Sequence, residues 1–241
     1  MSHPVRIAMW SGPRNISTTM MRSFGARADC AVSDEPFYGA FLKHTGADHP
    51  MAPQVIAAMD CDWASVTAAL NGPVPGGRAV WYQKHMPHHM ASSSSIAQFP
   101  DHAHAFLIRE PERVVASYGV KRGAATPEDL GYQRQWAYCQ WVLARGQTPV
   151  VVDTSSFLAD PEGKLPVLCA RLGIAWDPAM LRWAPGIHAD DGIWASHWYD
   201  AVAASTSFGP PPGPLPSLSG EAAQVAAQCR PFYEEMRAYA I

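Results

Sequence analysis

The sequence predicts an α/β fold of three layers, in which a central, mainly parallel sheet is flanked by helices. Two observations lead to this prediction. Short apolar runs of strand length recur along the chain, and segments with helix-start signals lie between them. Strands that alternate with helices form βαβ units, and such units build parallel sheets. A chain of 241 residues can bury one generous core, so we expect a single domain over residues 1–241.

The expected strands follow from apolar runs bounded by turn residues. Residues 5–10 form such a run and end at Ser-Gly-Pro, which is typical of a buried strand followed by a turn. A weaker candidate covers residues 30–33. Three more runs predict buried strands at residues 79–83, 103–108 and 149–152.

Two helices in the second half of the chain have clear start signals. Residues 126–129 combine a capping hydroxyl, a first-turn proline and two acids at the positive end of the helix dipole. Apolar residues then recur at helical spacing as far as Arg145. Residues 160–162 repeat the start signal, and Gly173 is the expected stop of that helix.

The end of the chain predicts a connector and a last helix. Residues 209–220 hold five prolines, too many for a helix or a central strand, so we expect an extended surface connector there. A C-terminal helix is expected over residues 219–241, with Pro231 breaking or kinking it.

Composition limits the classes of function. Hydrophobic residues make up 48% of the chain, charged residues make up 16%, and the net charge is -3. This charge argues against bulk binding to nucleic acid or to an acidic membrane, so any anion site must be local. The five cysteines are scattered without a C-x-x-C spacing, which favours reduced thiols. No signal-peptide pattern and no apolar run of about 18 residues is present, so we expect a soluble, cytoplasmic protein.

The stretch IAMWSGPRNISTTMM over residues 7–21 predicts an anion-binding loop. Gly12 and Pro13 suit a turn, and a helix that begins near Ser17 exposes unpaired N–H groups at the positive end of its dipole. Arg14 adds a fixed charge, and the hydroxyls of residues 17–19 add donors. The G-x-x-x-x-G-K-[ST] loop of nucleoside triphosphate enzymes is absent, so we expect an anion with fewer charges. Taken alone, the stretch fits an ordinary helix cap equally well.

A second stretch, FLIREPERVVASY over residues 106–118, has an arginine at a strand end and a proline-initiated helix. Ser117 follows Arg109 by eight residues. Together the two stretches resemble the sulfotransferase family, which uses 3′-phosphoadenosine 5′-phosphosulfate. Residues 13–19 match its P-[KR]-S-G-T-T motif with one extra residue and without the glycine. Its R-[DN]-P-x-[DE]-x-x-x-S-Y motif is matched at Arg109, Pro111, Ser117 and Tyr118, whereas Arg113 stands where an acid is common.

The resemblance implies a P-loop-type nucleotide-binding fold and assigns two phosphate sites. It implies that a first group of residues cradles the 5′-phosphosulfate: Arg14, Asn15, Ile16, Ser17, Thr18 and Thr19. It also implies that Arg109 and Ser117 hold the 3′-phosphate. The alternative for Arg109 is an ordinary ion pair with Glu110 or Glu112.

Two residues compete for the role of catalytic base. Residues 81–89 are similar to the K-x-H-[LF]-P segment of cytosolic sulfotransferases, but one residue shorter between lysine and proline. Lys84 would balance charge on the sulfonate, and His85 would take the proton of the acceptor. Glu35 lies in an E-P-[FLY] context similar to that of carbohydrate-directed members, and partial desolvation would make it a better base. We rank Glu35 slightly above His85.

Histidines cluster in the sequence, but no metal site is expected. No Cys or carboxylate joins them in a known ligand spacing. The histidines concerned are His85, His88, His89, His102 and His104.

A late aromatic segment has three possible roles. Residues 190–199, followed by residues 205–208, occur where sulfotransferases commonly fold an R-K-G triplet over the 3′-phosphate, and that triplet is absent here. The segment could replace the triplet, line the acceptor pocket or simply pack in the core.

The favoured hypothesis is an enzyme that moves a sulfonate to a hydroxyl or amine of a small organic acceptor. Neither nucleic acid nor membrane is an expected partner. One alternative is a P-loop kinase or NTPase, with Asp153 as the magnesium ligand. The other is a catalytically silent nucleotide-binding module of the same fold.

Overall fold

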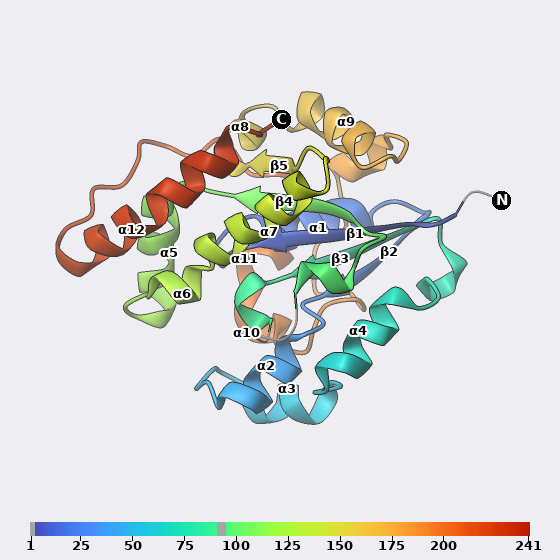
Figure 1. Cartoon of the computed structure of the whole chain (residues 1–241), viewed down its shortest axis with the longest axis horizontal. Helices are drawn as coiled ribbons and strands as arrows, with labels where there is room; N and C mark the ends of the chain where they lie inside the picture. The colour runs from blue at the N-terminus through green and yellow to red at the C-terminus, as the bar shows by residue number, and fades with distance from the viewer. Residues whose placement is uncertain (1–2, 91–94) are drawn as a thin grey trace.

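A computed structural model describes residues 3–90 and 95–241, except for the side chains of residues 121 and 122. Its centre is a five-stranded parallel sheet in the order β2-β3-β1-β4-β5 (Figure 1). The strands are β1 (Val5–Ser11), β2 (Cys30–Asp34), β3 (Val80–His85), β4 (Ala103–Ile108) and β5 (Val150–Asp153). Each expected strand is present, and the α/β fold class is confirmed.

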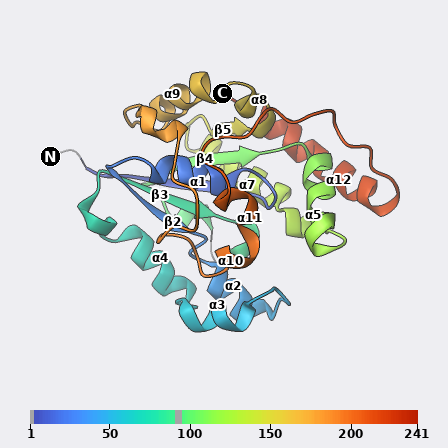
Figure 2. The same ribbon diagram turned by 180° about the vertical axis from the view of Figure 1, so that it is seen from behind.

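Helices cover both faces of the sheet, as Figures 1 and 2 show from opposite sides. On one face, α1 (Ser17–Gly25), α8 (Thr154–Ala159) and α9 (Pro161–Arg171) contribute to one core cluster together with Ile7 and Met9 of β1. The other face is covered by α4 (Trp63–Asn71), α5 (Pro111–Arg122), α6 (Pro127–Leu130), α7 (Tyr132–Ala144) and α12 (Gly220–Arg237). Consecutive residues of β1 pack into the cores on opposite faces of the sheet, because side chains alternate along a strand.

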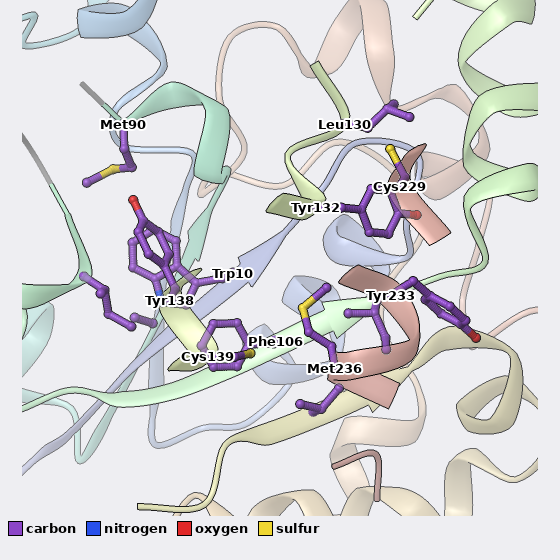
Figure 3. Close-up of a cluster of buried hydrophobic side chains, with 14 of the residues drawn as sticks. Trp10, Met90, Phe106, Leu130, Tyr132, Tyr138, Cys139, Cys229, Tyr233 and Met236 are labelled. Atoms are coloured by element: carbon purple, nitrogen blue, oxygen red, sulfur yellow. The ribbon is translucent and has the colours of Figure 1, made fainter. Parts of the chain in front are cut away.

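Aromatic and sulfur-containing side chains fill the core on the α7 and α12 side of the sheet. Figure 3 shows Trp10 and Phe106 from the strands beside Tyr138 of α7 and Met236 of α12. The Trp10 and Tyr138 rings meet edge to face at a centroid distance of 4.8 Å. This packing fixes β1 and β4 against the helices, and the loops after both strands approach the cavity described below.

A smaller cluster lies beyond the β2 edge, where α2 (Tyr38–Thr45) and α3 (Ala52–Ala58) meet α10 (Ala195–Trp198). Figures 1 and 2 both place these three helices together at the lower end of the molecule. The short helix α11 (Asp200–Ala203) follows α10 directly. Residues far apart in the sequence therefore form one wall next to the ends of β2 and β3.

Two helical expectations need correction. The helix expected from residue 126 to Arg145 is divided into α6 and α7, because Gly131 adopts a left-handed φ of 71°. The break allowed for at Pro231 does not occur, since α12 continues through that proline. Val225 and Tyr233, on either side of it, are buried against the core, which offsets the lost backbone hydrogen bond.

The remaining segments agree with the sequence in outline. Residues 209–219 contain no helix or strand, and Gly173 has the positive φ expected at a helix stop. After α12 the chain returns to the sheet, where the N–H of Ile241 donates to the carbonyl of Val151 at 3.0 Å. Short 3-10 turns complete the fold at Pro75–Gly77, Pro87–His89, Ile96–Gln98 and Pro178–Leu181. Across residues 3–90 and 95–241, none of the helices has the length and apolar character needed to cross a bilayer.

Candidate active site

A cavity of about 300 Å³ lies where β1 and β3 end, beside the first turn of α1. The carboxyl ends of parallel strands are the usual ligand site of an open α/β sheet. All but one of the residues nominated from the sequence line it: Arg14, Asn15, Ile16, Ser17, Thr18, Thr19, Glu35, Lys84, Arg109 and Ser117. The exception is His85.

The loop before α1 has the features of an anion site. Helix α1 begins at Ser17 with no side-chain cap and no acidic residue in its first turn. Its first N–H groups therefore offer donors to a ligand at the positive end of the helix dipole. Arg14 has a φ of 54°, a left-handed conformation that is uncommon for residues other than glycine. Such strain is often found where a loop must hold a ligand.

Asn15 holds this loop to the rest of the fold. Its side-chain NH2 donates to the Leu107 carbonyl on β4 at 2.8 Å, and the Thr154 hydroxyl donates to its side-chain oxygen. The same oxygen accepts the Ile16 N–H at 3.1 Å. The side chain of Asn15 is thus used to fix the loop, a role that the motif alone did not indicate.

The two phosphate motifs are in direct contact. The guanidinium of Arg109 donates to the Arg14 carbonyl at 2.8 Å, and the Nε of Arg14 donates to the Ser117 hydroxyl at 2.9 Å. Burial, followed by the neighbouring Arg113, lowers the pKa of Arg109 below its ordinary value. Positive charge is therefore concentrated here, at the place where an anion would relieve it.

The ion pair considered for Arg109 does not form. Glu110 pairs with Arg113 at 3.2 Å, and Glu112 pairs with Arg230. Within the described part of the chain, Arg109 makes no salt bridge, and its buried Nε lacks a hydrogen-bond partner. A buried donor without a partner is costly unless a ligand accepts its proton.

Lys84 is the most enclosed charge of the cavity, with a relative exposure of 1%. Its ammonium donates to the Thr18 hydroxyl at 2.8 Å, to Asp34 at 2.9 Å and to the Tyr199 hydroxyl at 2.8 Å. A carboxylate oxygen of Glu35 lies 2.9 Å away. Burial alone would lower the pKa of Lys84, but Asp34 and Glu35 outweigh it and raise that pKa well above its ordinary value. The lysine is therefore a permanent positive charge.

Glu35 follows β2 directly and faces the same ammonium. Its backbone has a φ of 43°, so it is a second cavity residue in the left-handed region. The side chain is 14% exposed, and its second oxygen lies 3.8 Å from the Nδ1 of His89. The buried rings of Phe37 and Tyr38 follow it in the chain. Glu35 thus presents a carboxylate to the cavity, between the Lys84 ammonium and the His89 imidazole.

The late aromatic segment forms part of the cavity wall. The cavity is lined by Trp194, Trp198 and Tyr199 of this segment and by Tyr38 of α2, which all belong to the small cluster beyond the β2 edge. The rings of Tyr38 and Trp194 meet edge to face at a centroid distance of 5.1 Å. Of the roles left open by the sequence, the structure shows wall formation next to Glu35 and Lys84, combined with packing.

A profile of the family described as "Sulfotransferase domain" matches residues 5–240 of the chain. The chain belongs to the sulfotransferase domain family. The resemblance carried by the two motifs is thereby confirmed.

Relatives of this sulfotransferase-family chain are known among curated proteins and solved structures. "Branched-chain-amino-acid aminotransferase-like protein 2" of Arabidopsis thaliana is 32% identical over 237 residues, and "protein 1" of the same name and organism is 34% identical over 212 residues. These matches cover 97% and 88% of this chain but 41% and 38% of the relatives, so the chain spans about two-fifths of their length. A solved "Sulfotransferase Domain from the Curacin Biosynthetic Pathway" is 16% identical, covers 95% of this chain and 99% of that chain, and has a TM-score of 0.47.

His85 does not reach the cavity of this sulfotransferase-family chain. It is adjacent to Lys84 on β3, and strand alternation sends the two side chains to opposite faces of the sheet. The imidazole of His85 stacks on Trp10 at a centroid distance of 4.7 Å and is 1% exposed. Burial, followed by the nearby His102 and His104, lowers the pKa of His85 well below its ordinary value. The geometry leaves Glu35 as the base candidate that faces the cavity.

The other histidines are divided between two places. His88 and His89 line the cavity, whereas His102 and His104 are buried at the amino-terminal end of β4, away from the cavity. In residues 3–90 and 95–241, no group of three or more His, Cys, Asp or Glu side chains could hold a metal ion.

Asp153 has a structural role in this sulfotransferase-family chain. Its carboxylate caps α8 by accepting the Ser156 N–H at 2.9 Å and also accepts the Tyr233 hydroxyl at 2.8 Å. It does not line the cavity. The magnesium-ligand role considered from the sequence therefore has no geometric support.

Proposed function

We propose that this chain transfers a sulfonate from 3′-phosphoadenosine 5′-phosphosulfate to a hydroxyl or amine of a small organic acceptor. One observation carries the proposal: both phosphate motifs, Lys84 and Glu35 line the same cavity. The sequence separates them, and the fold brings them together at the ends of β1, β2, β3 and β4.

The donor end of the cavity suits a doubly phosphorylated nucleotide. The open first turn of α1 and the hydroxyls of residues 17–19 would bind the phosphosulfate. Arg109, whose buried Nε lacks a partner, would bind the 3′-phosphate beside Ser117. The donor supplies an activated sulfonate, and transfer of that sulfonate to the acceptor leaves 3′,5′-adenosine bisphosphate.

Lys84 and Glu35 would have complementary tasks in the transfer. Glu35 would accept the proton of the acceptor as the new bond to sulfur forms. Lys84 would balance the negative charge on the sulfonate, and the α1 N–H groups would stabilise the negative charge that grows on the leaving phosphate oxygen. Much of the remaining acceleration would come from holding donor and acceptor in line.

The acceptor side of the cavity suggests the class of acceptor. It is walled by the aromatic side chains of Tyr38, Trp194 and Trp198, and Glu35 places a negative charge there. A ligand carboxylate would be repelled by Glu35, whereas an apolar or cationic body would pack against the rings. We therefore propose an uncharged or cationic alcohol or amine.

Thermal unfolding with different nucleotides tests this function. The melting temperature would be measured with 3′,5′-adenosine bisphosphate, with ATP and magnesium, and without ligand, because a ligand of the folded state raises it. We expect a rise with the bisphosphate alone, and a clearly smaller rise in Arg109→Ala, which keeps only the 5′-phosphate site. Arg145→Ala, which removes a guanidinium stacked on Trp141 outside the cavity, is the control and should keep the rise.

Two outcomes would contradict the proposal. A rise that requires ATP and magnesium would support a kinase or NTPase. A rise with the bisphosphate, without sulfonate transfer to any of a broad panel of alcohols and amines, would indicate a silent binding module.

A further inference from the structure

The ammonium of Lys84 makes as many hydrogen bonds as it has protons. An ammonium carries three donors. They go to Thr18, Asp34 and Tyr199, at 2.8, 2.9 and 2.8 Å. Glu35, at 2.9 Å, is a charge contact and not one of these three hydrogen bonds. An incoming anionic oxygen could therefore take the place of Glu35 without disturbing the other partners.

The partners differ in how firmly they are held. Asp34 and Lys84 are register partners on neighbouring strands, and their side chains are each 1% exposed. The Asp34 oxygen that does not contact Lys84 accepts the Tyr199 hydroxyl at 2.7 Å and the Gly192 N–H at 3.1 Å. Glu35, by contrast, is 14% exposed and faces the cavity. The Glu35 contact is therefore the one that can yield to a ligand.

The Tyr199 hydroxyl uses its one donor and both of its acceptor positions in hydrogen bonds. Burial, with the neighbouring Asp34 next, raises the pKa of Tyr199 well above its ordinary value, so the hydroxyl keeps its proton. That proton goes to Asp34, while the oxygen accepts from Lys84 and from the Trp194 indole at 3.1 Å. A hydroxyl has one donor and two acceptor sites, and all of them are used here.

The segment that carries Tyr199 is itself fixed. Tyr199 lies at the junction of α10 and α11. Upstream, Asp191 forms a buried salt bridge with Arg22 of α1, and Arg22 also donates to the Gly186 carbonyl at 3.1 Å. The salt bridge and the Gly186 hydrogen bond thus hold the late segment that carries the Tyr199 hydroxyl.

We propose that Tyr199 is a positioning residue for sulfonate transfer, holding the Lys84 ammonium so that it faces the cavity when an anionic oxygen displaces Glu35. This inference rests on the proposed function. Thr18, Asp34 and Tyr199 keep the ammonium in place during the exchange, and Glu35 is released to accept the proton of the acceptor. The late aromatic segment would thereby have two roles: Trp194 and Trp198 line the acceptor side of the cavity, and Tyr199 holds the Lys84 ammonium that meets the sulfonate.

Removing one hydroxyl tests the inference. Tyr199→Phe keeps the buried ring and should lower kcat by about tenfold or more, the usual weight of a hydrogen bond to a charged group. The affinity for 3′,5′-adenosine bisphosphate, which lacks the sulfonate, should stay within about threefold of the original. The matched control is Tyr233→Phe, which removes a buried hydroxyl that donates to Asp153 outside the cavity. It should keep kcat even if it lowers the melting temperature.

A double-mutant cycle separates positioning from a structural effect. If Tyr199 acts through Lys84, then Tyr199→Phe should have little further effect on kcat in a Lys84→Met background, because the two losses are not independent. Equal losses of kcat in Tyr199→Phe and Tyr233→Phe, or an additive cycle, would overturn the proposal.

An NMR measurement does not depend on activity. In lysine-selective ¹⁵N-labelled protein, proton exchange from the Lys84 ammonium should be slow in the original chain and in Tyr233→Phe, and faster in Tyr199→Phe. Unchanged exchange in Tyr199→Phe would overturn the inference. If the chain bound no nucleotide and moved no sulfonate, the proposed function would fail, while this measurement would still decide whether Tyr199 holds Lys84.

Discussion

Replacing Glu35 with glutamine would remove the proton acceptor while keeping the size of the side chain. Among the described residues that line the cavity, Glu35 provides the one carboxylate, with its two oxygens 2.9 Å from Lys84 and 3.8 Å from His89. A positioned general base contributes about 10²- to 10⁴-fold to a rate. Glu35→Gln should therefore lower kcat by that factor, which corresponds to about 3–5 kcal/mol of activation free energy.

The assay is steady-state sulfonate transfer with the donor and acceptor concentrations varied separately. The KM for the donor should change little, because Glu35 acts on the acceptor proton. Glu112→Gln is the matched control: its side chain is 21% exposed and pairs with Arg230 outside the cavity. A kcat for Glu35→Gln within about threefold of the original would refute the role of Glu35 as base.

Two further predictions concern the loop and the core. A Cβ added at Gly12 would lie 2.6 Å from the Leu130 carbonyl oxygen, so Gly12→Ala should lower the free energy of unfolding by about 1–3 kcal/mol and weaken nucleotide binding. The control Gly119→Ala should not destabilise the protein, because its added Cβ meets no atom within 4 Å. Equal urea midpoints for the two variants would contradict this prediction. Burial lowers the pKa of His102 and His104 to about 4, so the unfolded chain, with histidine pKa near 6.5, binds more protons between these values. The free energy of unfolding should therefore fall as pH drops from about 6.5 to 4, by up to about 1.4 kcal/mol per pH unit for each histidine, and urea unfolding that is independent of pH in this window would disprove it.

The sheet could be predicted because its signal is local. Parallel strands buried on both faces appear in the sequence as short apolar runs, and residues 103–108 were located with the correct bounds. The helix limits were harder to predict. A helical pattern of apolar residues continues across Gly131, whereas the backbone there turns left-handed. Of the break or kink that Pro231 predicts, the break does not occur, because tertiary packing on both sides of the proline holds α12 together.

The phosphate motifs could be found because their residue types and spacing are specific. The choice between Glu35 and His85 could not be made by motif similarity, although strand alternation next to Lys84 carried that information. The hydrogen bond between Lys84 and Tyr199 joins residues 115 positions apart. Nothing in either segment alone indicates its partner, so this part of the site required the fold.

Isothermal titration with two nucleotides tests the central claim, that one cavity recognises both phosphates of a single adenosine. The original chain should bind 3′,5′-adenosine bisphosphate about tenfold or more tightly than adenosine 5′-monophosphate, because Arg109 adds a charged contact to the 3′-phosphate. Arg109→Ala should lose this preference and still bind the monophosphate as before. Equal affinities of the original chain for both nucleotides, or an equal loss of both in the variant, would contradict the claim.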